Sequence, residues 1–257
     1  MEKTSYLAGT ASWTDLMTPD LEGAKKFYGS LFDWTYDDGG PAMGHYNRIM
    51  IRGKQVAGMM AQSTEEMKQM PSVWNTYFDT KDLDATLAKV NEAGGKTMMG
   101  PQDVMDLGRM AFCLDPAGGA FGFWQAGKHT GAQLFGEPGA MVWNEYRSRD
   151  LKPALAFYEK ALGNKIERLD GPMEYYTQKA ANLMHAGFMP MPEKVPAEVP
   201  PHWTVYFAVK SADDTAAKIK SLGGTVLMDP FDTEHGRMGS ARDKWGATFA
   251  FIQPVAT

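Results

Sequence analysis

The amino-acid sequence predicts an α+β fold in which four β-α-β-β-β modules are arranged as two tandem halves. Two observations carry this prediction. The chain repeats itself at a nearly constant offset, and each half alternates strand-like and helix-like segments in the same order. Of the 257 residues, 44% are hydrophobic and 22% are charged, which is ordinary for a folded globular protein. This composition excludes disordered and fibrous classes.

The internal repeat appears in two stretches. Ala11–Tyr28 and Met141–Tyr158 share a tryptophan, an acidic residue, Asp-Leu and Phe-Tyr at an offset of 130 residues. A longer match relates Val73–Gln125 to His202–Gln253 and includes a Gly-Arg-Met triplet in both copies. So many matches in register indicate a duplication, with a first domain at 1–127, a linker at 128–137 and a second domain at 138–257.

Each module is predicted to open with a strand that leads into a helix. Trp13–Met17 alternates as a strand, the segment ending at Asp20 supplies a helix start, and apolar residues then recur at helical spacing as far as Leu31. In the next module Trp74–Phe78 is strand-like, and the helix that starts at Leu83 stops at a Gly-Gly pair. Three more strands follow at 96–99, 109–114 and 120–125. A proline-rich stretch at 190–201 is predicted to be an extended surface connection.

Charge and cysteine content restrict the function class. The chain has 26 Lys and Arg against 31 Asp and Glu, a net charge of −5, without a basic run, so we expect no nucleic-acid partner. No apolar stretch approaches the roughly 20 residues that span a bilayer, and the first residues lack a secretory h-region, so we expect a cytoplasmic protein without a membrane partner. Cys113 is the single cysteine, and its place on a predicted core strand indicates a buried, unreactive thiol.

These motifs resemble the vicinal oxygen chelate superfamily, which contains glyoxalase I, bleomycin resistance proteins and extradiol dioxygenases. The resemblance covers essentially the whole chain and rests on Asp20-Leu21 with Phe27-Tyr28, Asp150-Leu151 with Phe157-Tyr158, Gly94-Gly95, Gly108-Arg109 and Asp115-Pro-Ala-Gly118. More narrowly, the chain is similar to two-domain glyoxalase-like proteins of actinobacteria, which include a secreted mycobacterial antigen. The resemblance implies two glyoxalase-like open-barrel domains, each a cupped sheet with helices outside, and it makes leaderless secretion a second expectation for location.

The resemblance also implies where a metal would be held. In metal-binding members the ligands are histidines seven residues before a helix start and a glutamate on the last strand. The corresponding residues here are Trp13, Asn75 and Gly122 in the first half and Trp143, Thr204 and Ala250 in the second. None of them is a usual metal ligand, so we expect no metal and no other cofactor. A displaced site using His185 and His202 is the less favoured alternative, because no histidine pair has metal-binding spacing.

Strand alternation predicts the side chains that line each cup. Those of the first half are Trp13, Asp15, Met17, Asn75 and Tyr77, and those of the second are Trp143, Glu145, Arg147, Thr204 and Tyr206. An aromatic wall with one acid suits a planar or cationic small molecule. In the alternative interpretation the tryptophans are core plugs and the acids pair with Arg109 or Arg237. We expect these two arginines to be strand-edge anchors with Asp103 and Asp232 as their partners.

Three functions follow from this site. The favoured one is metal-independent binding of a small molecule by a monomer or homodimer. The second is a glyoxalase-type lyase or isomerase that acts on 2-oxoaldehydes such as methylglyoxal adducts, with Asp15 and Glu145 as bases; this chemistry normally needs a Lewis acid as well. Extradiol cleavage of catechols ranks last, because its iron site requires two histidines and a carboxylate.

Overall fold

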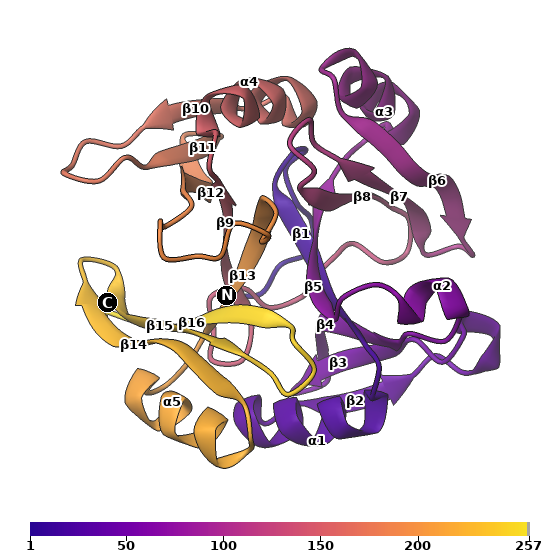
Figure 1. The fold of residues 1–257 in the computed structure, drawn as a ribbon. Helices are drawn as coiled ribbons and strands as arrows, with labels where there is room; N and C mark the ends of the chain where they lie inside the picture. The colour runs from indigo at the N-terminus through magenta and orange to yellow at the C-terminus, as the bar shows by residue number, and fades with distance from the viewer. Residues whose placement is uncertain (256–257) are drawn as a thin grey trace.

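The computed structural model describes residues 1–255 and contains two eight-stranded sheets, one from each half of the chain (Figure 1). The elements of the first half are β1 (Ala11–Thr18), α1 (Leu21–Phe32), β2 (Thr35–Asp38), η1 (Pro41–Met43), β3 (Asn47–Ile51), β4 (Lys54–Ala61), α2 (Glu65–Lys68), β5 (Val73–Asp79), α3 (Leu83–Glu92), β6 (Lys96–Val104), β7 (Gly108–Leu114) and β8 (Ala120–Ala126). Those of the second half are β9 (Met141–Ser148), α4 (Leu151–Leu162), β10 (Lys165–Arg168), β11 (Tyr176–Ala180), β12 (Leu183–Pro190), β13 (His202–Ala208), α5 (Ala212–Ser221), β14 (Thr225–Thr233), β15 (Gly236–Arg242) and β16 (Thr248–Pro254).

The two sheets have the same topology. Their strand orders are β2-β3-β4-β1-β5-β8-β7-β6 and β10-β11-β12-β9-β13-β16-β15-β14. In each sheet two β-α-β-β-β modules meet at a central antiparallel pair, β1 with β5 or β9 with β13. Each module therefore supplies one half of a sheet, which confirms the predicted fold class.

Local sequence sets the helix boundaries as expected. Asp20 caps α1 by accepting a hydrogen bond from the Gly23 backbone N–H at 2.9 Å, and Asp82 and Ser211 cap α3 and α5 in the same way. After α3, Gly94 has φ +88°, a left-handed conformation that glycine adopts without strain, so the chain turns there.

The hydrophobic core lies between the two sheets and is shared by both halves. In Figure 1, α3 lies beside α4 and α1 lies beside α5, so each helix pair joins two halves of the chain. The Tyr28 hydroxyl of α1 donates to Asp243 at 2.9 Å, and the Tyr158 hydroxyl of α4 donates to Asp115 at 2.9 Å. Because all four side chains are buried, each half supplies polar and apolar groups that complete the core of the other.

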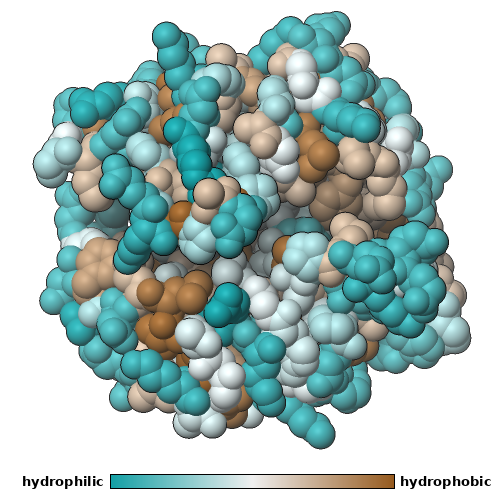
Figure 2. Space-filling model, viewed as in Figure 1, coloured by the Kyte–Doolittle hydropathy of each residue, from teal (hydrophilic) through white to brown (hydrophobic). Residues whose placement is uncertain are grey.

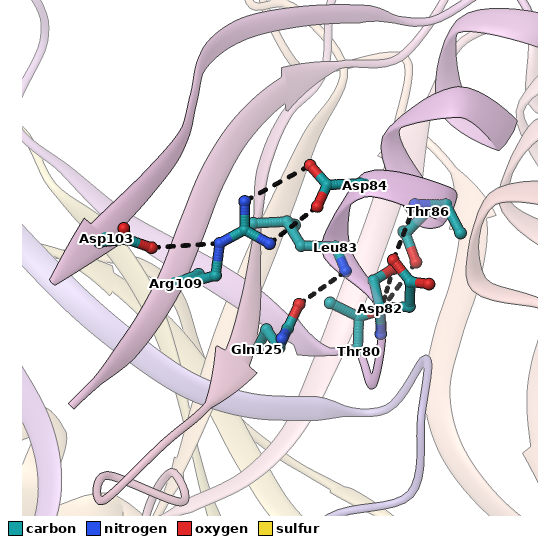
Figure 3. A network of polar contacts seen from close by, with 9 residues as sticks. Thr80, Asp82, Leu83, Asp84, Thr86, Asp103, Arg109 and Gln125 are labelled. Atoms are coloured by element: carbon teal, nitrogen blue, oxygen red, sulfur yellow. Dashed lines mark hydrogen bonds and ion pairs between the residues drawn. The ribbon is translucent and has the colours of Figure 1, made fainter. Parts of the chain in front are cut away.

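Several surface and core predictions can be compared with this fold. Arg109 pairs with Asp103 at 3.2 Å and with Asp84 at 2.8 Å (Figure 3), and Arg237 pairs with Asp232 and with Asp213, so both are strand-edge anchors as expected. Cys113 is buried, and burial raises the pKa of its thiol to about 12. Within residues 1–255, no helix is both long and apolar enough to cross a bilayer.

Candidate functional site

The floor of the first cup is built around one buried carboxylate. Asp15 is 3% exposed and accepts three hydrogen bonds, from Asn75 Nδ2 at 2.9 Å, from the Tyr46 hydroxyl at 3.1 Å and from the Tyr77 hydroxyl at 3.0 Å. The Trp13 indole N–H then donates to the Tyr46 hydroxyl at 2.9 Å. Burial raises the pKa of Asp15, and the three donors partly oppose this shift.

The second cup repeats this floor with one added charge. Glu145 is 5% exposed and accepts from the Tyr206 hydroxyl at 2.8 Å and from the Tyr175 hydroxyl at 3.0 Å, while the Trp143 indole N–H donates to Tyr175 at 3.0 Å. Arg147 takes the place of Met17 and donates to Glu145 through Nε at 2.9 Å and Nη2 at 2.8 Å. The carboxylate of the second cup is therefore neutralised by an internal cation.

In both cups the tyrosines act as hydroxyl donors. Burial and the neighbouring carboxylate together raise the pKa of Tyr46 and Tyr77 in the first cup and of Tyr175 and Tyr206 in the second. A protonated phenol can donate to the acid and still accept a hydrogen bond from an indole. Each floor is thus a connected network of tryptophan, tyrosine, acid and tyrosine.

Two glycines make room for these networks. Gly58 lies beside Asp15, and Gly187 lies beside Glu145, in the parallel pairing of adjacent strands. A Cβ atom on Gly58 would lie 1.8 Å from the Tyr46 hydroxyl, and one on Gly187 would lie 1.9 Å from the Tyr175 hydroxyl. Glycine is therefore required at both positions for the tyrosine to reach the acid across the sheet.

Tyr46 and Tyr175 are absent from the residues that the sequence predicted for the cups. Strand alternation could not find them, because Tyr46 precedes β3 and Tyr175 precedes β11. The repeat does carry a signal: an offset of 129 residues relates Tyr46 to Tyr175, Gly58 to Gly187 and Trp74 to Trp203.

The predicted cup residues do lie on one face, since Trp13 pairs with Tyr77, and Asp15 with Asn75, across β1 and β5. Met17 on β1 and Thr204 on β13 are also buried, although Thr204 makes no hydrogen bond to Glu145.

The first cup is filled by its own chain. Residues of the linker fold back over it, and the His129 ring packs edge-on against Trp13 with the ring centroids 4.4 Å apart. The Trp124 indole N–H donates to the His129 carbonyl at 2.8 Å, and the Tyr6 hydroxyl donates to the Ala132 carbonyl at 2.7 Å. Burial lowers the pKa of His129 to about 4, with a smaller contribution from Arg48, so the ring is neutral at pH 7. Trp13 is consequently only 4% exposed.

The second cup has smaller side chains at the equivalent positions. The strand registers relate Phe112 to Ser240 and Trp124 to Ile252. Trp143 and Arg147 remain partly exposed, unlike Trp13 and Met17. On the cup face of the outer strands, Phe231 pairs with Met238 and Met238 with Ile252. Figure 2 shows apolar side chains gathered on the surface over β14–β16. The second cup thus has smaller side chains at these two positions and leaves Trp143 partly exposed.

The side chains at the metal positions of the fold do not form a donor set. Trp13, Gly122, Trp143 and Ala250 offer no ligand atom, and the amide of Asn75 is already bound to Asp15. Among residues 1–255, no three His, Cys, Asp or Glu side chains are arranged to hold a metal. Of the histidines considered for a displaced site, His185 contacts the Ala180 carbonyl and His202 the Pro200 carbonyl.

The tandem cupped sheets agree with a comparison against known families. A model of the Glyoxalase/Bleomycin resistance protein/Dioxygenase superfamily matches residues 10–123 and 140–251, and the chain belongs to this superfamily. Solved structures with the same fold include the Mn(II)-bound glyoxalase from Novosphingobium aromaticivorans, with a TM-score of 0.66 and 17% identity, covering 97% of this chain and 83% of that one. Another is the 2,3-dioxygenase LapB from Pseudomonas sp. KL28, with a TM-score of 0.64 and 13% identity, covering 96% of this chain and 93% of that one.

Two curated relatives are similar over nearly their whole length. The Mycobacterium tuberculosis protein named "Putative glyoxylase CFP32" is 41% identical over 99% of this chain and 98% of its own. The Streptomyces peucetius protein named "Anthracycline biosynthesis protein DnrV" is 34% identical over 97% of this chain and 95% of its own. The predicted similarity to a two-domain mycobacterial glyoxalase-like protein is therefore confirmed.

Proposed function

We propose that this protein binds a planar, aromatic small molecule without a metal ion, and that the second cup is its ligand site. The observation that carries the proposal is the difference between two cups of common origin. Both keep the same polar floor, but His129, Phe112 and Trp124 fill the first, whereas the second has Ser240 and Ile252 and leaves Trp143 partly exposed.

The shape and lining of the second cup support an aromatic ligand. Trp143 offers a ring face whose indole N–H is held by Tyr175, so the ring is fixed before a ligand arrives. A rigid aromatic surface with a few placed polar groups is the usual composition of a small-molecule site. The relative named for anthracycline biosynthesis fits the same ligand class, since anthracyclines are planar polycyclic molecules.

The donor chemistry supports independence from metals. Indole, amide, hydroxyl, methyl and hydrogen side groups occupy positions where metal-binding members place histidine and glutamate. Glu145, the acid that the described residues place on the floor of the second cup, already accepts hydrogen bonds from two tyrosines and one arginine. A carboxylate engaged in this way positions its neighbours, and it has little remaining capacity to ligate a cation.

A glyoxalase-type lyase is the second candidate, favoured by the name of the mycobacterial relative. It would use Asp15 or Glu145 as the base that removes a proton from the substrate. A base must lie within hydrogen-bond reach of that proton. Here both carboxylates are at most 5% exposed and point their oxygens at tyrosine hydroxyls, so the geometry supports ligand binding better than proton abstraction.

Titration of the purified protein with anthraquinone-2-carboxamide tests the proposal. Tryptophan quenching and calorimetry should show one site per chain, with the same dissociation constant after dialysis against EDTA. The matched control is the double variant Ser240→Phe and Ile252→Trp, which copies the filled first cup into the second and should abolish binding. The proposal is wrong if binding requires added Mn²⁺ or Zn²⁺, or if the double variant binds like the wild type. Metal-dependent conversion of methylglyoxal and glutathione would instead support the lyase.

A further inference from the structure

Cross-strand neighbours at the edge of the two cups differ sharply in charge. In the first cup Met17 of β1 pairs with Val73 of β5, and both are apolar. At the equivalent place in the second cup Arg147 of β9 pairs with His202 of β13. Both halves kept the acid and the tyrosines of the floor. At its edge, however, the apolar pair of the first cup corresponds to an arginine and a histidine in the second.

Internal neutralisation does not by itself account for Arg147. Asp15 is as buried as Glu145 and is satisfied by two tyrosines and an amide, without any cation. The scaffold can therefore hold a buried acid on this floor with uncharged donors alone. In the second cup Thr204 stands in place of Asn75 and gives Glu145 no hydrogen bond, so Arg147 supplies the missing donor. One uncharged N–H would suffice for that, and Arg147 adds a positive charge and a further N–H group.

Only one side of the Arg147 guanidinium is used by the protein. Nε and Nη2 donate to Glu145, and Nη2 also contacts the Tyr206 hydroxyl at 3.2 Å. Nη1 makes no hydrogen bond within residues 1–255, and it is not sealed from solvent. The ion pair with Glu145 and the contact with Tyr206 hold the guanidinium in one orientation, so Nη1 is presented in a fixed direction.

His202 faces Arg147 across the strand pair, and Glu145 is the acid that the guanidinium already binds. His202 uses Nδ1 to contact the Pro200 carbonyl at 2.9 Å, which leaves Nε2 free for another partner. Arg149 lies two residues beyond Arg147 and binds backbone carbonyls of the proline-rich segment, including Pro196 at 2.6 Å. The positive charges of Arg147 and Arg149 contribute, after burial, to the lowered pKa of His202, whereas Glu145 opposes them. The oxygens of Glu145 face the tyrosines and Arg147.

We propose that Arg147, with His202 beside it, selects ligands that carry an acidic oxygen, a carboxylate or phenolate, at the end of the aromatic system that meets β9 and β13. This inference rests on the proposed function and names the ligand chemistry of the same site. Arg147 Nη1 donates to the anionic oxygen. His202 uses its Nδ1–H on the Pro200 carbonyl, so its Nε2 can only accept, for example from a hydroxyl group beside that oxygen. A cationic ligand is disfavoured in this cup, because its acid is already paired.

A matched pair of probes tests this inference. Anthraquinone-2-carboxylate and anthraquinone-2-carboxamide have nearly the same shape but differ in charge. Calorimetry should show that wild-type protein binds the carboxylate at least about tenfold more tightly, a difference of about 1.4 kcal/mol. Raising the salt concentration from 0.05 to 0.5 M should weaken binding of the carboxylate, because salt screens a contact between charges. Binding of the carboxamide should stay nearly unchanged.

Arg147→Met installs the residue of the first cup and should remove the preference, so that this variant binds carboxylate and carboxamide with affinities within about threefold of each other. His202→Val should leave the preference for the carboxylate in place, because Nε2 of the neutral ring accepts and does not donate. Arg147→Lys keeps the positive charge but not the planar guanidinium, and it should retain part of the preference for the carboxylate. It replaces Arg147→Met in the test if circular dichroism shows that Arg147→Met does not fold.

The outcomes separate the two proposals. If wild-type protein binds neither probe at millimolar concentration, the proposed function fails. If it binds both equally, or if Arg147→Met keeps the preference for the carboxylate, the proposed function stands and the role of Arg147 is refuted.

Discussion

Replacing Gly187 by alanine tests whether the glycine exists to let Tyr175 reach Glu145. The new Cβ would lie 1.9 Å from the Tyr175 hydroxyl, 2.6 Å from Cζ of the same ring and 2.9 Å from the Trp143 indole nitrogen. No side chain tolerates such distances, so Tyr175 must leave its position. The hydroxyl then loses its bond to Glu145 and its bond from Trp143.

The expected cost follows from these two hydrogen bonds. A bond to a charged group contributes about 1.5–3 kcal/mol and a neutral one about 0.5–1.5 kcal/mol, while Gly→Ala within a strand returns about 0.5–1 kcal/mol. We therefore expect Gly187→Ala to lower the free energy of unfolding by about 1–4 kcal/mol. Urea denaturation monitored by far-UV circular dichroism measures this free energy and does not depend on the fluorescence of Trp143, which the substitution perturbs.

A double-mutant cycle makes the test specific. Tyr175→Phe removes the hydroxyl and both hydrogen bonds, so adding Gly187→Ala to it should cost no more than about 1 kcal/mol further. Gly58→Ala with Tyr46→Phe is the equivalent cycle in the first cup, where the distance is 1.8 Å. Gly29→Ala in α1, whose nearest neighbour would be the Trp34 carbonyl at 3.3 Å, should be close to neutral. Full additivity of Gly187→Ala and Tyr175→Phe, or wild-type stability of Gly187→Ala, would refute the reasoning.

Two further predictions concern the shared core and the filled cup. Tyr28→Phe leaves the Trp74 indole N–H without its buried partner and removes the bond to Asp243 Oδ2, while Asp243 Oδ1 keeps its two backbone donors; it should cost about 2–4 kcal/mol in urea denaturation. Tyr176→Phe, which loses only an exposed contact to Glu174, should cost less than about 0.5 kcal/mol, and equal costs would contradict a core completed across the halves. Because the folded pKa of His129 is about 4, below its unfolded value of 6.5, its contribution to stability is fully present above pH 6.5 and is lost as the pH falls from 6.5 to 4, by about 1–3 kcal/mol. His129→Phe should flatten that part of the stability profile relative to wild type and to the exposed-site control His235→Gln, and an unchanged slope would show that the histidine is not buried neutral.

Elements that depend on neighbours in the chain were predictable. Asp20 could be recognised as a helix start because a cap bonds to a backbone amide three residues later. The faces of the central strands could be assigned because side chains alternate along a strand. Accordingly, Phe78 packs toward the helices, while its neighbour Tyr77 packs with Trp13 in the first cup. The duplication could be recognised because matching residues recur at a nearly constant offset along the chain.

The contents of the cups could not be read in this way. Tyr46 reaches Asp15 only because β4 pairs in parallel with β1 and places Gly58 beside the acid, and that pairing joins segments more than 30 residues apart. His129 belongs to a linker whose composition does not reveal that it folds back onto Trp13. Both arrangements depend on contacts between distant segments, which local periodicity does not encode.

The sequence by itself determined the modules, their order, their caps and the face that each central strand turns to the cup, because these depend on backbone hydrogen bonds and side-chain alternation over a few residues. The tertiary structure alone decided that the two halves complete each other's core clusters through Tyr28 and Tyr158, that tyrosines satisfy the buried acids, and that His129 packs on Trp13 while Trp143 stays partly exposed. These features are set by which side chains meet when distant strands and helices pack, and steric fit at such contacts is a property of the folded chain.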